Sequence, residues 1–311
     1  MNSQNNNNLI LGIIIPVHNG LEYTKVCLNS LKENIVFAHL NDSKVKIIVV
    51  DDGSADGTES WIKSNFPEVI ILKGDGNLWW SGSINMGVRF AIEHLSCNFI
   101  LWWNNDIRAT NEYLGDLWNI LHEININTIV GSKIYIEHNG KIFSMGGKFD
   151  PVIGEKYLMG FNENDQEDFT INKEADWFPG MGTCMHKSVY EDIGYLNNKD
   201  FPQYHGDSDF TYRAKLKGYI LTTFPVLVLY NDYRNTGLKH QGNLKHLINT
   251  LISIKSEYNI RKDLKFYKLY ATSYKAYRII FKRYYQYIGG FLKWSFLSIF
   301  GIKKNESNAL K

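Results

Sequence analysis

Cysteine is scarce in this sequence, which has only Cys27, Cys97 and Cys184 among 311 residues. The three lie far apart, and no two of them form a CxxC pair. This usage indicates neither a disulfide framework nor a zinc knuckle. A reducing compartment fits such a sequence best, so we expect the protein in the cytoplasm.

The sequence also lacks the segments that export a chain or anchor it across a membrane. Residues 1–8 are polar and rich in Asn, without the basic and apolar regions of a secretory signal, and we expect them to be disordered. The apolar stretch 288–302 has 15 residues and contains Lys293. A helix needs ~20 apolar residues to cross a bilayer core, so we expect no spanning helix.

Neither charge sign dominates the whole chain, whose net charge is +2, but the two signs are unevenly distributed. Residues 1–238 contain 19 Lys and Arg against 29 Asp and Glu, a balance of −10. Residues 239–311 contain 15 against 3, a balance of +12. Such a basic tail favours an anionic surface, either lipid headgroups or nucleic acid. Because the body is acidic and carries no recognised nucleic-acid motif, we expect no nucleic-acid partner.

The composition is otherwise that of a folded protein. Hydrophobic residues make up 44% and charged residues 21%, close to globular averages. The aromatic share of 14% is high, and it suits either packed cores or flat apolar walls for a ligand or a membrane interface. A chain of 311 residues has room for one large α/β domain with an appendage, or for two domains.

Short apolar runs alternate with helical stretches over the first hundred residues. The predicted strands are 9–15, 45–50, 69–72 and 98–103. This alternation predicts an α/β fold, with a mostly parallel sheet flanked by helices and a Rossmann-like nucleotide-binding half. The loops that follow the strands then meet at one edge of the sheet, where the ligands of such sheets bind.

Beyond this region the pattern changes twice. Short strand segments at 129–149 and a polar loop at 161–174 precede a predicted helix at 187–193. The last ~70 residues place Tyr, Lys and Leu at helical spacing. We therefore predict one domain over residues 9–238 and a helical, basic and aromatic extension over residues 239–311.

Four polar motifs occur in order along the chain. They are Pro16-Val17-His18-Asn19, Asp51-Asp52-Gly53-Ser54, Asn104-Asn105-Asp106 and Tyr204-His205-Gly206-Asp207-Ser208-Asp209-Phe210. In order and spacing they resemble the inverting family 2 glycosyltransferases, over roughly residues 9–235, and most of all the polysaccharide-assembling members of rhamnosyltransferase type. The resemblance implies the GT-A fold for residues 9–238.

A nucleoside-diphosphate sugar needs hydrogen-bond acceptors for its base and ribose, which Asp51 and Asp52 can supply at a strand end. Their alternative role is a turn with a helix cap. The Gly-rich segment 73–85 lets the backbone approach a ligand and offers Trp faces for stacking, and it contains no G-x-G-x-x-G fingerprint. The resemblance assigns both segments to a UDP- or dTDP-linked sugar. The donor-binding residues that we predict are Pro16, Val17, His18, Asn19, Asp51, Asp52, Gly53, Lys73, Gly76, Asn77, Trp80, Asn85, Asn104 and Asn105.

The pyrophosphate of such a donor needs its charge offset, because the leaving group gains negative charge as the glycosidic bond breaks. Asp106 is predicted to bind a divalent cation, Mg²⁺ or Mn²⁺, as the Asp-x-Asp motif does in the family. Asn104 stands at the first position of that motif, and its carbonyl oxygen can still ligate a hard cation. The alternative for Asp106 is an ordinary surface loop.

Inversion requires a base that removes the proton of the acceptor hydroxyl. The resemblance aligns Asp207 with the Asp of the family's Glu-Asp-x-Asp segment, in which Gly206 replaces the Glu, so Asp207 is the predicted base. Asp209 is expected to pair with Arg213, four residues further along a helix. The acceptor-side residues that the resemblance implies are Trp177, Gly180, Met181, Gly182 and His205, with core packing as the alternative for Trp177.

Together these residues predict a metal-assisted, inverting glycosyltransferase that extends a glycan or a lipid-linked glycan in cell-surface polysaccharide assembly. The rival interpretation is a non-catalytic module that binds a nucleotide sugar or a glycan, although such a module has no need of a base. We expect the tail to hold the protein at the inner membrane face, with apolar residues of 288–302 flanked by Lys282, Arg283, Lys303 and Lys304 on an anionic surface. Packing against the domain, or against a second copy in a homo-oligomer, is the alternative.

Overall fold

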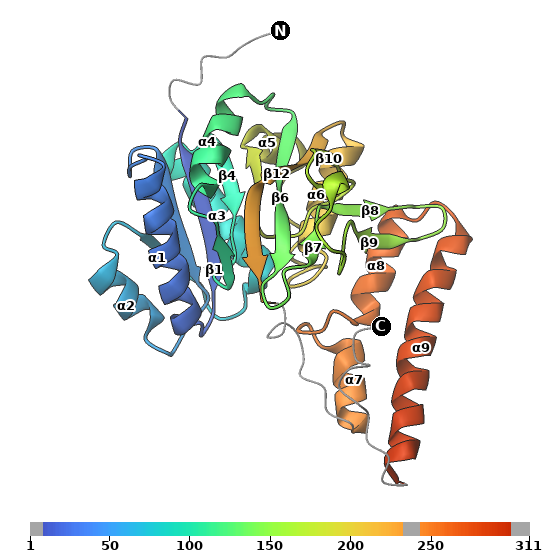
Figure 1. The fold of residues 1–311 in the computed structure, drawn as a ribbon. Helices are drawn as coiled ribbons and strands as arrows, with labels where there is room; N and C mark the ends of the chain where they lie inside the picture. Colours follow the sequence, from blue (N-terminus) through green and yellow to red (C-terminus); the bar gives the residue numbers. More distant parts are fainter. Residues whose placement is uncertain (1–8, 233–242, 300–311) are drawn as a thin grey trace. The chain divides into compact units, whose positions relative to one another are not determined.

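The computed structural model of the protein describes residues 9–232 and 243–299 (Figure 1). It divides into two compact units. One unit comprises Met1–Lys148 and Tyr157–Asn235, and the other comprises Phe149–Lys156 and Thr236–Lys311. The predicted disordered start, residues 1–8, and the predicted boundary at residue 238 lie outside the described residues. The short segment 149–156 belongs to the C-terminal unit, a division that chain order alone does not reveal.

The N-terminal unit contains a ten-stranded sheet in the order β10-β12-β6-β11-β4-β1-β2-β3, with β5 beside β12 and β7 beside β6. Strands β1 to β4 are mutually parallel, as predicted, whereas β11 is antiparallel to both β4 and β6. The strands are β1 (Leu11–Val17), β2 (Val45–Asp51), β3 (Ile70–Lys73), β4 (Phe99–Trp102), β5 (Ile107–Ala109), β6 (Thr128–Ile136), β7 (Ile142–Ser144), β10 (Lys173–Glu174), β11 (Thr183–His186) and β12 (Ile220–Asn231). The predicted α/β class, with a mostly parallel sheet flanked by helices, is confirmed.

Helices cover both faces of this sheet (Figure 1). They are α1 (Leu21–Phe37), α2 (Thr58–Asn65), α3 (Trp79–Leu95), α4 (Tyr113–Glu123), α5 (Ser188–Ile193) and α6 (Gly206–Leu216). Successive side chains of a strand point to opposite faces, and Ile13 and Ile15 of β1 pack into one core with α1, α2 and α4. Ile14 packs into a second core with α3, α5 and α6. The uninterrupted apolar run of β1 is therefore needed, because both of its faces are buried.

The C-terminal unit consists of α7 (Leu244–Ile252), α8 (Ile260–Tyr270) and α9 (Tyr274–Ile299), together with residues of the short ribbon β8 (Gly147–Phe149) and β9 (Lys156–Leu158). The ring of Phe149 packs edge-on against Phe266 of α8, with the ring centroids 5.4 Å apart. The predicted helical character of the tail is thus seen over residues 243–299. No helix in the described part of the chain is both long and apolar enough to cross a membrane.

The packing of α3 on β1 depends on the missing side chain of Gly87. A Cβ at this position would lie 2.4 Å from Cγ2 of Ile14 and 3.2 Å from Cγ2 of Val50. We expect Gly87→Ala to lower the free energy of unfolding by about 1–3 kcal/mol, because the added methyl overpacks the core. Chemical denaturation measures this change.

Gly115→Ala is the matched control, since its Cβ would meet Ala38 only at an ordinary 3.6 Å. There the better helix propensity of Ala should leave stability unchanged or raise it by up to about 1 kcal/mol. Equal effects of the two substitutions would show that the contact between Gly87 and Ile14 does not limit the packing of α3.

Candidate functional site

The ends of β1, β2 and β3 bring the first predicted motifs to one edge of the sheet. Val17 lies opposite Asp51 in parallel register, and Asp51 lies opposite Lys73. The loops that follow are joined directly, because His18 Nδ1 donates to the carbonyl oxygen of Asp52 at 2.7 Å. The motif at Pro16-Val17-His18-Asn19 and the motif at Asp51-Asp52-Gly53 therefore form one continuous surface.

Asp52 holds the Gly-rich loop against the end of β2. The residue is only 5% exposed, and its carboxylate accepts hydrogen bonds from the backbone N–H groups of Gly76 (2.8 Å) and Trp79 (3.0 Å). Gly53 has φ +76° and a Cβ there would lie 3.2 Å from the Gly76 backbone, which explains the glycine. Asp52, which was predicted to contact the nucleobase, therefore also fixes the backbone of the loop that leads into α3.

Three of the residues predicted to bind the nucleotide sugar form an ion pair or hydrogen bonds with other residues of the protein. Lys73 Nζ lies 2.8 Å from a carboxylate oxygen of Glu59, on the surface. The backbone N–H of Asn77 donates to Asp75 within the loop. The side-chain amide of Asn85 donates to the carbonyl oxygen of Leu196 and accepts from its N–H, both at 2.9 Å. Asn85 therefore joins α3 to the segment after α5, an alternative use of the amide that we expected to contact the donor.

The loop after β4 contains Asn104 and Asp106, which were predicted to bind the metal, and Asn105, which was predicted to bind the nucleotide sugar. Asn105 Nδ2 donates to Thr24 Oγ1 at 3.0 Å, which fixes this loop on α1. Asn104 Oδ1, the atom expected to ligate a cation, accepts a hydrogen bond from Trp80 Nε1 at 3.0 Å. Asp106 is half-buried, and its pKa is raised by burial and by the negative charge of Asp232.

Asp232 is a residue that the sequence analysis missed. Strand β12 pairs with β5 in antiparallel register, with Leu229 opposite Ala109 and Asn231 opposite Ile107. Continued by one residue, this register would place Asp232 opposite Asp106, which lies 126 residues earlier in the chain. The charge of Asp232 raises the pKa of the Asp106 carboxyl, as expected of two neighbouring carboxylates. No local pattern around Asp232 indicates this pairing, because it is created by the long-range register of β5 and β12.

The two carboxylates suit a hard divalent cation. Mg²⁺ and Mn²⁺ bind through oxygen ligands, and Mg²⁺ commonly uses one or two carboxylates while phosphate and water complete its shell. A cation between Asp106 and Asp232 would relieve the repulsion that raises the pKa of Asp106. No cluster of three or more His, Cys, Asp or Glu side chains suited to a metal occurs within residues 9–232 and 243–299. Two carboxylates, those of Asp106 and Asp232, are a ligand set that suits a cation whose other ligands are phosphate oxygens and water.

Asp207 lies in the first turn of α6, after His205, which begins the helix with φ +67°. Its Oδ2 accepts from the backbone N–H of Gly180 (2.9 Å) and its Oδ1 from the N–H of Ser208 (2.7 Å). Backbone donors and a helix N-terminus both favour a negatively charged carboxylate, which is the state that a general base requires. The predicted pairing of Asp209 with Arg213 is confirmed at 3.2 Å.

Trp80 connects the loop of Asp106 with the carboxylate of Asp207. Its indole N–H donates to Asn104, and its ring lies against Gly180, where a Cβ would be 2.2 Å from the ring atom Cζ2. The N–H of Gly180 in turn donates to Asp207. We call these four residues, Asn104, Trp80, Gly180 and Asp207, the Trp80 bridge. The ring is also held edge-on by Trp102, with the ring centroids 5.6 Å apart.

The other residues predicted to bind the sugar acceptor lie in the loops before β11 and before α6, and some of them pack into the core. Trp177 is 8% exposed and its Nε1 donates to the carbonyl oxygen of Lys148, so the core-packing alternative describes its contacts. Met181 packs partly against the first core. Gly182 has φ +68°, and a Cβ there would lie 2.4 Å from Leu229. The ring of His205 lies 5.8 Å from that of Phe201.

Comparison with known proteins places these motifs in context. Residues 12–194 match the family described as Glycosyl transferase family 2. The low-salt glycan biosynthesis hexosyltransferase Agl10 of Haloferax volcanii is 24% identical over 180 residues, 55% of this chain and 53% of that protein. An uncharacterised glycosyltransferase of Rickettsia typhi is 23% identical over 186 residues, 59% of this chain and 50% of that one. The chain thus spans about half the length of the curated relatives that it matches.

Solved structures share the fold at low sequence identity. A mannosyltransferase of Pyrobaculum calidifontis in complex with GDP-Man and Mn²⁺ has a TM-score of 0.51 at 15% identity, covering 73% of this chain and 58% of that one. GalNAc-T7 with UDP, GalNAc and Mn²⁺ has a TM-score of 0.56 at 13% identity, covering 81% and 50%. These likenesses support the GT-A fold for the N-terminal unit.

The Trp80 bridge predicts an energetic coupling between positions 80 and 180. We expect Gly180→Ala to lower the free energy of unfolding by about 1–3 kcal/mol, because its methyl group collides with the Trp80 ring. In the Trp80→Ala background the collision is gone, so the two effects should deviate from additivity by about 0.5–3 kcal/mol. Chemical denaturation of the two single variants and the double variant measures the coupling. Additive effects would contradict a direct contact.

Proposed function

The chain belongs to glycosyl transferase family 2, and from this we propose that it transfers a sugar from a nucleoside-diphosphate sugar to a hydroxyl group of a glycan or lipid-linked glycan. The proposed reaction is a single inverting displacement in cell-surface polysaccharide assembly. The observation that carries the proposal is the Trp80 bridge, which joins the loop of the carboxylate suited to a cation with the loop of the proposed base.

In this reaction Asp207 removes the proton from the acceptor hydroxyl while the hydroxyl oxygen attacks the anomeric carbon. The bond between that carbon and the phosphate oxygen breaks on the opposite side, and the nucleoside diphosphate leaves with the electron pair. One displacement inverts the configuration, so no covalent intermediate with the protein is needed. The N–H groups of Gly180 and Ser208 each donate to one oxygen of the Asp207 carboxylate and so orient it toward the acceptor side.

Asp106 and Asp232 would hold the divalent cation, with Asn104 oriented beside them by Trp80. When bound, the cation offsets the negative charge that develops on the departing pyrophosphate. The loops of Asp51 and Asp52 would receive the base and ribose, and the backbone of the Gly-rich loop would approach the phosphates. The acceptor would lie on the side of Gly180, Met181 and His205.

The proposed nucleotide-sugar donor and divalent cation are supported by what similar proteins bind. Agl10 is a hexosyltransferase of glycan biosynthesis, and the similar solved structures contain GDP-Man, or UDP with GalNAc, and Mn²⁺. For this chain we propose a UDP- or dTDP-linked sugar and either Mg²⁺ or Mn²⁺. A panel of nucleotide sugars tests the proposal through donor hydrolysis and thermal shift with and without these cations. Binding without any turnover across the panel and a set of glycan acceptors would favour a non-catalytic module.

Replacing the proposed base separates chemistry from donor binding. We expect Asp207→Asn to lower the turnover number by about 10²–10⁴-fold, since the amide cannot accept the hydroxyl proton. Donor affinity, measured by isothermal titration calorimetry, should stay within a few-fold of the parent. Asp42→Asn, an exposed site, is the matched control and should have the parent rate. Near-parent turnover in Asp207→Asn would remove this residue as the base.

The carboxylate pair predicts a pH-dependent cation site. Because the pKa of Asp106 is raised, its proton competes with the cation, so metal-dependent donor binding should weaken as the pH falls through that pKa. Asp232→Asn removes a charge that raises this pKa, so the midpoint should move to lower pH. The same variant loses a ligand, and its Mn²⁺ affinity should fall at least about tenfold. Calorimetric Mn²⁺ titrations over a pH series measure both effects, and an unchanged affinity with an unchanged midpoint would exclude Asp232 from the site.

A further inference from the structure

The rotation of α9 within the C-terminal unit is fixed by contacts along one side of the helix. Ala276, Ile280 and Tyr284 on this side are 0%, 3% and 4% exposed. The hydroxyl of Tyr284 donates to Asp263 Oδ2 of α8 at 2.8 Å, and Arg283 donates to the same oxygen at 3.2 Å. Since Asp263 is itself buried, these bonds determine which side of α9 faces outward.

The outward side carries large hydrophobic side chains. Phe281 is 70% exposed, Tyr285 81%, Leu292 58% and Phe296 61%. Their spacing of four, seven and four residues keeps them on one stripe of an α-helix. Single exposed apolar residues are common on proteins, whereas a contiguous row of large ones marks an interaction surface.

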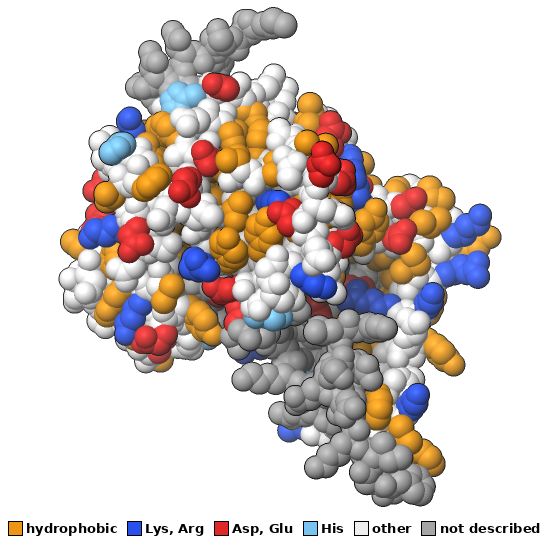
Figure 2. Space-filling view, viewed as in Figure 1, with side chains coloured by type: hydrophobic (Ala, Val, Ile, Leu, Met, Phe, Trp, Pro, Cys, Tyr) orange, Lys and Arg blue, Asp and Glu red, His pale blue; other side chains and the backbone are white. Residues whose placement is uncertain are grey.

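Exposed cations accompany this stripe, and α9 contains no Asp or Glu in its 26 residues. Lys275, Lys282 and Lys293 are seven and eleven residues apart, close to whole numbers of turns, so they follow one border of the stripe. Arg278 is also exposed. Figure 2 shows Lys and Arg side chains among hydrophobic ones on the visible part of the C-terminal unit. We call the four hydrophobic residues and these four cations the α9 outer face.

The structure shifts the basic-aromatic surface from the place where the sequence suggested it. Arg283, expected to flank the anchor, is bonded to Asp263. Within the predicted stretch 288–302, Phe296 is exposed, whereas Phe291, Trp294 and Leu297 are half-buried. The exposed stripe begins before this stretch, at Phe281. Phe300, Lys303 and Lys304 lie outside the described residues.

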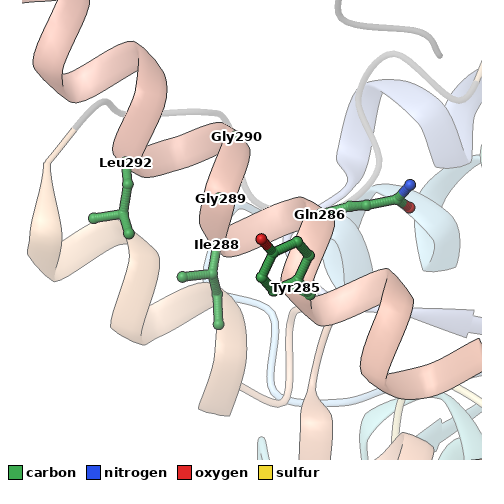
Figure 3. Close-up of a pocket in the computed structure, with 6 residues that line it drawn as sticks. All are labelled: Tyr285, Gln286, Ile288, Gly289, Gly290 and Leu292. Atoms are coloured by element: carbon green, nitrogen blue, oxygen red, sulfur yellow. The ribbon is translucent and has the colours of Figure 1, made fainter. Parts of the chain in front are cut away.

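A hollow of about 420 Å³ lies along the same helix, lined by Tyr285, Gln286, Ile288, Gly289, Gly290 and Leu292 (Figure 3). Ile288 and Leu292 point to one side of α9, whereas Gln286 points away from them. Gly289 and Gly290 contribute no side chains, which leaves space on the helix surface beside the two aliphatic ones. The lining is mainly apolar, which suits a helix face that is buried in the boundary between headgroups and acyl chains.

We propose that the α9 outer face binds an anionic lipid bilayer, with α9 lying in the plane of the interface. The helix is about 39 Å long, and its large apolar side chains would enter the boundary between headgroups and acyl chains. The lysines along the border would contact lipid phosphates. This surface is separate from the proposed transfer reaction, although it would bring the protein to a lipid-linked acceptor.

The charges of α9 favour this partner over two others. A second copy that paired through α9 would bring cations against cations with no acidic residue on either helix, so this contact would be repulsive. A nucleic acid would be attracted by the lysines but would not require the row of exposed Phe, Tyr and Leu side chains. An anionic bilayer offers phosphate groups to the cations and an apolar boundary to the exposed hydrophobic side chains.

Flotation of the full chain with vesicles tests the proposal, using phosphatidylcholine alone or mixed with phosphatidylglycerol, and without donor or metal. We expect binding to the mixed vesicles and a weakening of that binding as salt is raised. The triple variant Phe281→Ser, Tyr285→Ser, Leu292→Ser should bind at least about tenfold more weakly, and so should Lys275→Glu, Lys282→Glu, Lys293→Glu. These side chains are exposed, so thermal unfolding should match that of the parent.

The matched control lies on α7, where Leu244, Ile248 and Ile252 are 64%, 49% and 52% exposed at helical spacing. Their replacement by Ser removes a similar apolar row without touching α9 and should leave vesicle binding within about twofold of the parent. The proposal is overturned if the parent ignores phosphatidylglycerol vesicles, if the α9 variants bind like the parent, or if only the α7 variant loses binding. It is also overturned if the parent is a dimer that the α9 variants dissociate. Donor hydrolysis by the same proteins, measured in separate samples that contain donor and Mn²⁺ but no vesicles, tests the transfer reaction independently.

Discussion

The candidate site depends on the placement of one indole ring. Trp80 uses its N–H on Asn104 and its ring face on Gly180, so a single side chain connects the loop after β4 with the loop before β11. The ring packs against Gly180 where a side chain would lie, and the backbone N–H of the same glycine donates to Asp207. The position of the proposed base therefore depends on contacts made by a residue on another helix.

The carboxylates at this edge of the sheet have different surroundings, and the differences indicate different uses. Asp52 and Asp207 accept backbone N–H groups on both oxygens, which fixes the orientation of the two carboxylates. Asp106 instead is destabilised as an anion by burial and by Asp232, which raises its pKa. A cation bound there, together with a donor pyrophosphate, would reverse that penalty, so cation and donor should strengthen each other's binding.

The sequence predicted the parallel half of the sheet and its polar edge because both arise from local patterns. The buried strand Leu11–Val17 is a continuous apolar run, and the residue pairs that meet at the edge follow from strand order. Asp232 and the Trp80 bridge were not predictable in this way. They depend on the antiparallel register of β5 with β12 and on a ring contact between distant loops, and neither leaves a periodic signal in the chain. Asn85 and Trp177 have buried protein partners, which residue type alone does not reveal.

The anomeric configuration of the first sugar released decides whether the proposed displacement inverts. Donor hydrolysed by the protein, in the presence of Mn²⁺, releases a free sugar whose anomeric signals can be followed by proton NMR before mutarotation mixes the two forms. We expect the first-formed sugar to have the anomeric configuration opposite to that of the donor. A first-formed sugar with the donor's own configuration would contradict the proposed inversion.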